Sequence, residues 1–388
     1  MVSIGNLIRD RRDALGLRLE DVAARAHLPA DKLAAFEENR GTVTAAAADR
    51  VAQVLAVDPS ALREGRIEKR PAATLFFFQP AMFADFRDME DRPKVIEALE
   101  RAIALAGLGV LLGRPQSRRA EFAPEGPTPE AAKDGYRLAG QVRAAIGSET
   151  GPIVDMTRLL EEDFDILVRT EPLASATISA LTVKDNVGGA AAVIVNTNNE
   201  RRTNPSTTRV DLAHELSHVL FDPPGEGDLD LVVDQDRPGE KGQRERDGAD
   251  STVPELSEQR ARAFAAELLL PAEGLRELLG KPRYVKSLDE AGALLGRVRD
   301  RYQTPIEITV NHLVNRDHLV HWLRQPVIDW ARRHEPRPPS ARPPNLAPPR
   351  PDLLERRVRE ALDRDLITDE RARELLGLTP WDELPKTA

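Results

Sequence analysis

Apolar side chains recur at helical spacing over residues 210–221, and the rest of the chain is organised around this stretch. The apolar positions lie on one side of the expected helix: Leu212, Leu216, Val219 and Leu220. No Pro or Gly interrupts the stretch, and the sequence Asp-Pro-Pro-Gly at 222–225 ends it. The pattern therefore predicts one amphipathic helix with a sharp C-terminal end.

The remaining pattern predicts an α+β fold in which helices predominate. Helical periodicity predicts helices at 95–112, 129–146, 156–162 and 257–270. It also predicts four or five short helices within 3–62, two helices within 288–325 and a final pair within 352–376. Aliphatic and β-branched runs predict strands at 165–169, 178–183 and 191–196. The Gly-Gly pair at 188–189 predicts a hairpin between the last two strands.

Composition shifts divide the chain into five segments. We expect an all-α domain at 1–65, a helical connector at 66–128, a domain with the small sheet at 129–325, a Pro-rich linker at 326–351 and a C-terminal helical segment at 352–388. Five of the ten Phe residues lie at 76–86, as a packing cluster or as a dimer or interdomain interface. The polar, acidic stretch 225–253 is longer than most loops and is expected to be an insertion, a lid or a disordered segment.

Composition also limits the kinds of site that the chain can hold. There is no Cys, so a zinc site must use His, Asp or Glu, and a disulfide-stapled secreted protein is not indicated. Arg residues at 9–12 interrupt any apolar signal core, and the longest apolar run, 102–113, is too short to span a bilayer. We therefore expect a cytoplasmic protein with no membrane partner. The net charge of −9 restricts any DNA contact to a local patch.

The helix at 210–221 carries the motif H-E-x-x-H, here HELSH. His214 and His218 are four residues apart and share one helix face, with Glu215 beside them. A zinc hydrolase uses such a pair of imidazoles to hold its metal and such a carboxylate to act on water. The alternative is a helix with two incidental histidines, but the helical context supports the motif.

The N-terminal residues resemble a lambda-repressor-like (XRE) helix-turn-helix. The matching stretches are residues 19–26, the turn at 27–28 and residues 33–37. Leu19 stands where family members usually carry Gln, and Asn39 stands where they usually carry Gly. The resemblance implies a compact DNA-binding unit of about sixty residues.

Charge argues against tight DNA binding by this domain. Residues 1–60 hold eight basic and nine acidic side chains. The expected recognition helix, 29–38, has no Arg, Asn or Gln to read bases, and its Asp31, Glu37 and Glu38 are expected to repel phosphates. For residues 1–65, a DNA-binding role and a protein-interaction or dimerisation role both stay open.

Residues 130–325 resemble the ImmA/IrrE-type metallopeptidases. The HELSH motif is followed by the pattern E-x-x-A-x-x-F-A-x-x-L-L-x-P at 258–271. The strand ending at Asn196 and the run 209–218 also match. The resemblance implies a zincin-like peptidase domain in which a small sheet lies beside the HExxH helix.

Carried over by position, the resemblance implies a Zn²⁺ site with the ligands His214, His218 and Glu258, and Glu215 as the catalytic carboxylate. A catalytic zinc keeps three protein ligands, which agrees with this set. Glu255 and Glu267 are rivals for the third ligand, but the first lies near the helix start and the second on another helix face. The forty positions between the second His and Glu258 exceed the gap expected for the family, which leaves the conformation of the intervening loop open.

Family members also carry a helix-turn-helix-like segment after the ligand helix, and residues 288–313 fit it. His312, His318 and His321 lie there or just beyond. They either reach the zinc site to stabilise an oxyanion or are surface and core-edge residues.

The resemblance implies a zinc endopeptidase that cleaves a partner transcriptional repressor in response to stress or a mobile element. Two alternatives stay open. One is a DNA-binding transcriptional regulator whose peptidase-like domain senses a ligand or metal without cleaving, and the other is a structural adaptor in which zinc pins two helices. The expected partners are a repressor as protein substrate, DNA through residues 1–65, and a second copy of the chain in a homodimer.

Overall fold

The computed structural model describes residues 3–14, 18–55, 57, 62, 65, 91–114, 117–186, 189–199, 205–224, 229–235, 252–334, 352–379 and 382–384. The Phe cluster at 76–86, Gly188 of the expected hairpin turn and most of the linker predicted at 326–351 lie outside these residues. The chain forms two compact units, one of residues 1–100 with 185–189 and 225–230, the other of 101–184, 190–224 and 231–388. In the described part of the chain, no helix is both long enough and apolar enough to cross a membrane.

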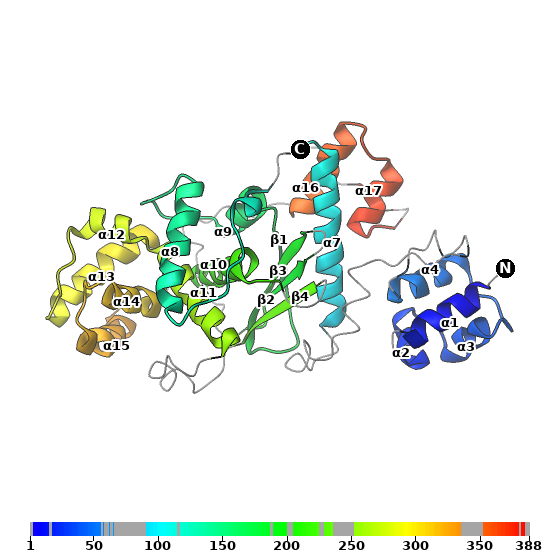
Figure 1. The fold of residues 1–388 in the computed structure, drawn as a ribbon, viewed down its shortest axis with the longest axis horizontal. Coiled ribbons are helices and arrows are strands. Elements are labelled where there is room, and N and C mark those ends of the chain that lie inside the picture. The colour runs from blue at the N-terminus through cyan, green and yellow to red at the C-terminus, as the bar shows by residue number, and fades with distance from the viewer. Residues whose placement is uncertain are drawn as a thin grey trace. The chain divides into compact units, whose positions relative to one another are not determined.

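Four short helices form the N-terminal domain within its described residues: α1 (Ile4–Ala14), α2 (Leu19–Arg25), α3 (Ala30–Glu37) and α4 (Ala45–Val54) (Figure 1). This agrees with the predicted pattern of short helices. Their apolar faces meet in a core that includes Ile8, Val22, Leu33 and Val51. Asn39 has a positive φ of 58°, which Asn adopts at lower cost than most residues, so it can stand in the place of a Gly.

The structure corrects the expectation for one charged residue of the predicted recognition helix, Glu37. Glu37 is buried, and Arg12 donates to both of its carboxylate oxygens, from Nε at 2.8 Å and from Nη2 at 2.7 Å. Arg11 is buried as well, and its Nε donates to the carbonyl of Leu55. The expectation that Glu37 repels phosphates is therefore wrong, because its charge is neutralised inside the domain. Without these three side chains, six basic and eight acidic residues remain in 1–60, so the balance stays acidic.

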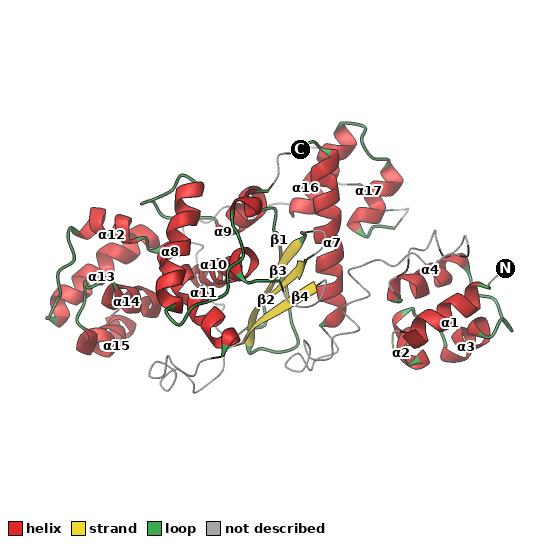
Figure 2. Cartoon of the chain, in the orientation of Figure 1, coloured by secondary structure: helices red, strands yellow, loops and turns green. Residues whose placement is uncertain are grey.

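The second unit contains a four-stranded sheet in the order β1-β3-β2-β4 (Figure 2). Its strands are β1 (Leu167–Glu171), β2 (Ile178–Asp185), β3 (Ala191–Asn196) and β4 (Leu229–Gln235). The three predicted strands are confirmed, and β2 and β3 pair antiparallel, as the hairpin prediction required. β1 pairs with β3 in parallel. β4 lies in the stretch predicted to be loop, so that prediction is wrong for 229–235. The aliphatic residues Leu229 and 231–233 were a strand signal within this otherwise polar stretch.

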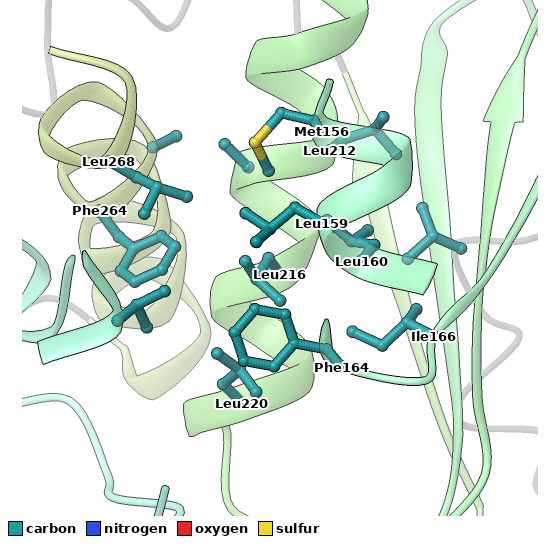
Figure 3. Close-up of a cluster of buried hydrophobic side chains, with 14 of the residues drawn as sticks. Met156, Leu159, Leu160, Phe164, Ile166, Leu212, Leu216, Leu220, Phe264 and Leu268 are labelled. Carbon is teal, nitrogen blue, oxygen red and sulfur yellow. The ribbon is translucent and has the colours of Figure 1, made fainter. Parts of the chain in front are cut away.

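The predicted motif helix is α10 (Pro205–Phe221), and it packs against α11 (Val253–Leu269) and β3. A core of buried aliphatic and aromatic side chains surrounds it. Figure 3 shows Leu212, Leu216 and Leu220 of α10 facing Phe264 and Leu268 of α11. The same core takes residues from α9 (Met156–Arg158) and from the π-helical turn that continues it (Leu159–Asp163). This packing fixes α10 and α11 with respect to each other.

A second helix, α8 (Ala131–Ala145), lies along α11. The two backbones approach closely at Gly135, where an added Cβ would lie 2.4 Å from the carbonyl oxygen of Arg260 and 2.7 Å from the amide nitrogen of Phe264. Only Gly allows this approach, because any side chain would collide with the backbone of α11. A 3₁₀ turn (Arg118–Glu121) precedes α8.

The C-terminal side of this unit is a helical lobe with its own core, which includes Leu295, Val298, Val310 and Val327. It contains α12 (Ala272–Leu279), α13 (Leu288–Tyr302), α14 (Ile306–Asn315), the 3₁₀ turn His321–Leu323 and α15 (Arg324–His334). The two helices predicted around 304–305 are confirmed as α13 and α14. α15 occupies residues assigned to the Pro-rich linker, because Val327, Ile328 and Ala331 give its sequence an apolar face that the lobe buries.

The C-terminal helical pair is α16 (Leu353–Asp363) and α17 (Asp369–Leu376) (Figure 1). α16 contacts residues 101–105 of α7 (Arg92–Leu111), where Arg101 donates to Asp352 at 3.1 Å. Arg357 of α16 donates to the carboxylate of Asp165 and to the carbonyl of Leu105. Arg356 donates to Glu161 at 2.6 Å. These contacts attach α16 to the segment 161–165, which leads into β1.

Candidate metal centre

Helix α10 places the two motif histidines next to each other in the interior of the unit. His214 and His218 are four residues apart on one face of the helix, and both are buried. Their Nε2 atoms are 3.0 Å apart. Both imidazoles therefore present the same nitrogen to one point.

The carboxylate of Glu258, on α11, completes this cluster. One of its oxygens lies 3.4 Å from Nε2 of His214, and the other lies 3.4 Å from Nε2 of His218. Among the residues that the structure describes, these three side chains are the group whose ligand atoms converge closely enough to hold a metal ion. The separation of forty positions from the second His to Glu258 thus does not keep the two helices from meeting.

The donor set fits zinc in kind and in spacing. Two imidazoles and a carboxylate are a usual set for catalytic zinc. Ligand atoms bound at 2.0–2.1 Å around a tetrahedral ion lie about 3.3 Å from one another, by simple trigonometry. The separations of 3.0, 3.4 and 3.4 Å in this cluster are close to that value.

The two rival carboxylates are engaged elsewhere. Glu255 forms a capping box with Thr252 at the start of α11. Glu267 lies 3.1 Å from Nε2 of His312, pairs with Arg316 and accepts the amide of Ala272. Each rival thus stabilises a helix end or a helix contact, which leaves Glu258 as the carboxylate at the histidines.

Glu215 is fully buried next to the histidines. Thr182 of β2 donates its hydroxyl to Oε2 of Glu215 at 2.5 Å. Lys184, two positions further and on the same face of the strand, donates to the carbonyls of His218 and Asp222 at 3.4 and 3.2 Å. Strand β2 therefore positions the Glu215 carboxylate and also satisfies carbonyls in the last turn of α10.

The second ring nitrogen of His218 also has a carboxylate partner. Its Nδ1 lies 2.7 Å from Oδ2 of Asp222, the residue that follows the end of α10. Arg260, which is fully buried on α11, donates Nη2 to the other oxygen of Asp222 and Nη1 to the carbonyl of Glu125. His218 is therefore held between Glu258 on one side and the Asp222–Arg260 pair on the other.

The electrostatics of the cluster favour ionised carboxylates. Burial by itself would raise the pKa of Glu258, but its contacts with His214 and His218 outweigh burial and hold that pKa far below its usual range. Burial would likewise raise the pKa of Asp222, but the hydrogen bond with His218 and the charge of Arg260 lower it. Burial lowers the pKa of His218, but the hydrogen bonds to Asp222 and Glu258 outweigh it and raise that pKa. The carboxylates of Glu258 and Asp222 are therefore ionised, and they stabilise positive charge on the ring of His218 between them.

The other histidines considered for the site are placed differently. His312 is buried against Glu267, and its ring packs edge-on to Tyr136 with centroids 5.6 Å apart. His318 is buried, whereas His321 is exposed on the 3₁₀ turn. None of these three belongs to the converging cluster of the described residues. An oxyanion role for them gains no support from these positions.

Three functional neighbours, Thr182, Asp222 and Arg260, were not identified from the sequence. Asp222 did carry a signal, because it stands four residues after His218 and thus one helical turn away. Thr182 and Arg260 carried none, because strand alternation and helix spacing do not tell which distant side chain each will meet.

Comparison with protein families agrees with this geometry. Residues 161–313 match the model of the Peptidase_M78 family, described as the IrrE N-terminal-like domain, and residues 3–65 match a helix-turn-helix domain. No curated protein matches the chain. The first match contains the whole of α10 and α11, which bring the cluster together. The resemblance to ImmA/IrrE proteins is therefore confirmed for these two segments: residues 161–313 match an IrrE N-terminal-like domain, which indicates a metallopeptidase-like segment, and residues 3–65 match a helix-turn-helix domain.

Proposed function

We propose that the chain is a zinc-dependent endopeptidase that cleaves a partner protein, a helix-turn-helix transcriptional repressor, and so switches gene expression. The observation that carries the proposal is the convergence of His214, His218 and Glu258 beside Glu215. The match to a peptidase family supports the same reaction class.

In this proposal, Zn²⁺ bound by the three ligands supplies a Lewis acid that polarises the scissile carbonyl and lowers the pKa of water. The buried carboxylate of Glu215 takes a proton from the attacking water and delivers it to the leaving amine nitrogen. Thr182 restrains that carboxylate through Oε2, so Glu215 does not need to reorient between the two transfers. Proton transfer and positioning are thus the work of α10 and β2.

Exposure indicates the side from which a peptide approaches. The side chain of Glu258 is 27% exposed, whereas the side chains of His214 and His218 are 6% and 1% exposed. We therefore expect the substrate carbonyl to reach the site past Glu258, along the N-terminal part of α11.

The N-terminal domain supports a repressor as the partner. Helix-turn-helix domains commonly associate in pairs on DNA. The domain at 3–65 would bind the corresponding domain of the repressor and hold that protein near the peptidase. The acidic balance of residues 1–60 favours this protein contact over a phosphate contact.

A second candidate function is a transcriptional regulator whose peptidase-like domain senses a ligand or metal without cleaving. The burial of Glu215, His214 and His218 favours it, because a closed site can hold a metal ion without admitting a peptide. The two functions differ in turnover, and metal content alone does not separate them.

The test is incubation of the purified full-length chain with repressors encoded by neighbouring genes, with and without a chelator, followed by mass spectrometry. We expect a discrete cut in one repressor that the chelator abolishes, and about one zinc per chain. Glu215→Gln should retain the zinc and lose the cut, because an amide cannot accept the proton.

His214→Ala and His218→Ala serve as the metal controls, and each should lose most of the zinc. Full zinc retention in both variants would sink the site assignment. An undiminished cut with Glu215→Gln would show that another group accepts the proton. Zinc binding without any cut in these repressors would favour the sensing function.

A further inference from the structure

We infer that Asp222 and Arg260 form a positioning pair that fixes the ring of His218 for metal binding. This inference rests on the proposed zinc site and assigns it two further residues. The pair acts through His218, and neither of its residues belongs to the converging ligand cluster.

The first step is the tautomer of His218. Asp222 is a carboxylate that accepts from Arg260, so the hydrogen bond of 2.7 Å between His218 Nδ1 and Asp222 Oδ2 requires the proton on Nδ1. In the neutral ring, the lone pair then lies on Nε2, the nitrogen that faces His214 and Glu258. Asp222 thus selects the tautomer in which His218 can bind a metal.

The second step is the orientation of Asp222 itself. It follows the last residue of α10, where a free carboxylate would turn toward water. Arg260 binds its other oxygen, and this guanidinium is anchored in turn to the carbonyl of Glu125 at 2.5 Å. Because both carboxylate oxygens are bound, the carboxylate plane and the ring of His218 are restrained together.

The third step concerns the helix that supplies these groups. Glu258 and Arg260 are two residues apart on α11. Glu258 lies at Nε2 of His218 directly, whereas Arg260 reaches Nδ1 of the same ring only through Asp222. α11 therefore contributes a ligand and also the support of another ligand. A carboxylate that accepts the second N–H of a metal-binding His is a common device, and its loss weakens metal affinity about 10–100-fold.

The experiment measures the Zn²⁺ dissociation constant of the full-length chain by competition with a chromophoric chelator. Asp222→Ala should weaken zinc binding about 10–100-fold, and Arg260→Gln should weaken it in the same direction by less. Asp222→Asn should bind zinc more tightly than Asp222→Ala, because its amide oxygen can still accept from Nδ1 of His218. The visible absorption of the Co²⁺-loaded protein should change in Asp222→Ala, because the ring of His218 is released.

Arg143→Gln is the matched control. Arg143 is also a buried arginine of this unit, but it donates to the carbonyls of Leu268, Ser148 and Gly151. Its loss should lower the unfolding temperature and leave the zinc dissociation constant unchanged. If Asp222→Ala does not fold, the comparison of Asp222→Asn and Arg260→Gln with Arg143→Gln decides the question.

Unchanged zinc affinity in the Asp222 and Arg260 variants would overturn the positioning role and leave the proposed peptidase intact. An equal loss of affinity in Arg143→Gln would overturn it too, because general destabilisation would then explain the effect. Absence of zinc binding in the unaltered chain would instead overturn the metal site on which both proposals rest.

Discussion

The close approach of α8 and α11 gives a sharp prediction about Gly135. In Gly135→Ala, the new Cβ would lie 2.4 Å from the carbonyl oxygen of Arg260 and 2.9 Å from Cβ of Ala263, whereas ordinary contact begins near 3.4 Å. The helices must therefore separate by about 1 Å at this point, and the obstructing atom is backbone, which cannot rotate away. Overpacking of this kind costs about 1–3 kcal/mol.

An opposing effect must be subtracted. Replacing Gly by Ala inside a helix stabilises it by about 1 kcal/mol. Since the collision is with backbone, we take the upper end of the overpacking range and expect a net loss of about 2 kcal/mol in the free energy of unfolding. Gly140→Ala, on the same helix, is the matched control: nothing lies within 4 Å of its added Cβ, so it should gain about 1 kcal/mol.

Urea unfolding of both variants, followed by far-UV circular dichroism, measures the difference, which should be about 3 kcal/mol. The zinc affinity of Gly135→Ala should fall as well, because α11 carries Glu258 and Arg260. Equal unfolding midpoints for the two variants would refute the argument, since helix propensity alone treats the two glycines alike.

Two further predictions concern charge. Burial raises the pKa of Glu161 to about 7 although Arg356 lies beside it, so the folded state holds a proton that the unfolded chain has released, and stability should fall from about pH 5 to about pH 8. Thermal unfolding across this range should show the fall in stability in the unaltered chain and in the control Glu162→Gln, which changes the less buried neighbour. Glu161→Gln should show a flatter dependence of stability on pH. Identical pH profiles in all three proteins would contradict the assignment. DNA binding by the full-length chain should be weak and should depend little on salt. Each neutralised phosphate adds about 0.9 to the slope of log affinity against log salt concentration. Few phosphates can be neutralised, because Arg11 and Arg12 are engaged inside the domain. A gel shift across salt concentrations measures this slope, and tight, sequence-specific binding at physiological salt would contradict it.

Local sequence signals were sufficient for the elements whose pattern is regular. The H-E-x-x-H spacing placed His214 and His218 on one face of α10, and the structure brings their Nε2 atoms together. Glu258 depended on the family pattern, because helix spacing alone does not show that α11 returns to α10. Helix position argued against its rivals, and tertiary contacts such as that of Glu267 with His312 show where they are engaged instead.

The sequence could not reveal the contacts between side chains that lie far apart along the chain. Glu37 looked like an exposed acidic residue of a recognition helix, yet Arg12, twenty-five positions earlier, draws it inside. Thr182 looked like an ordinary strand residue, yet the strand order brings it to Glu215. Charge counts and strand periodicity are averages over a segment, so they do not identify such individual partners.

The attachment of α16 affects how the protein is completed during synthesis. Arg357 binds Asp165, 192 positions earlier, and Arg356 binds Glu161, 195 positions earlier. The ribosome therefore finishes the sheet and both helices of the candidate metal centre long before it reaches the helix that supplies these arginines. A product cut short before residue 352 would keep the complete metal cluster and leave Glu161 and Asp165 without these arginines. Attachment of α16 thus distinguishes a chain that contains residues 353–363 from one cut short before them, by stability and not by loss of the candidate metal ligands.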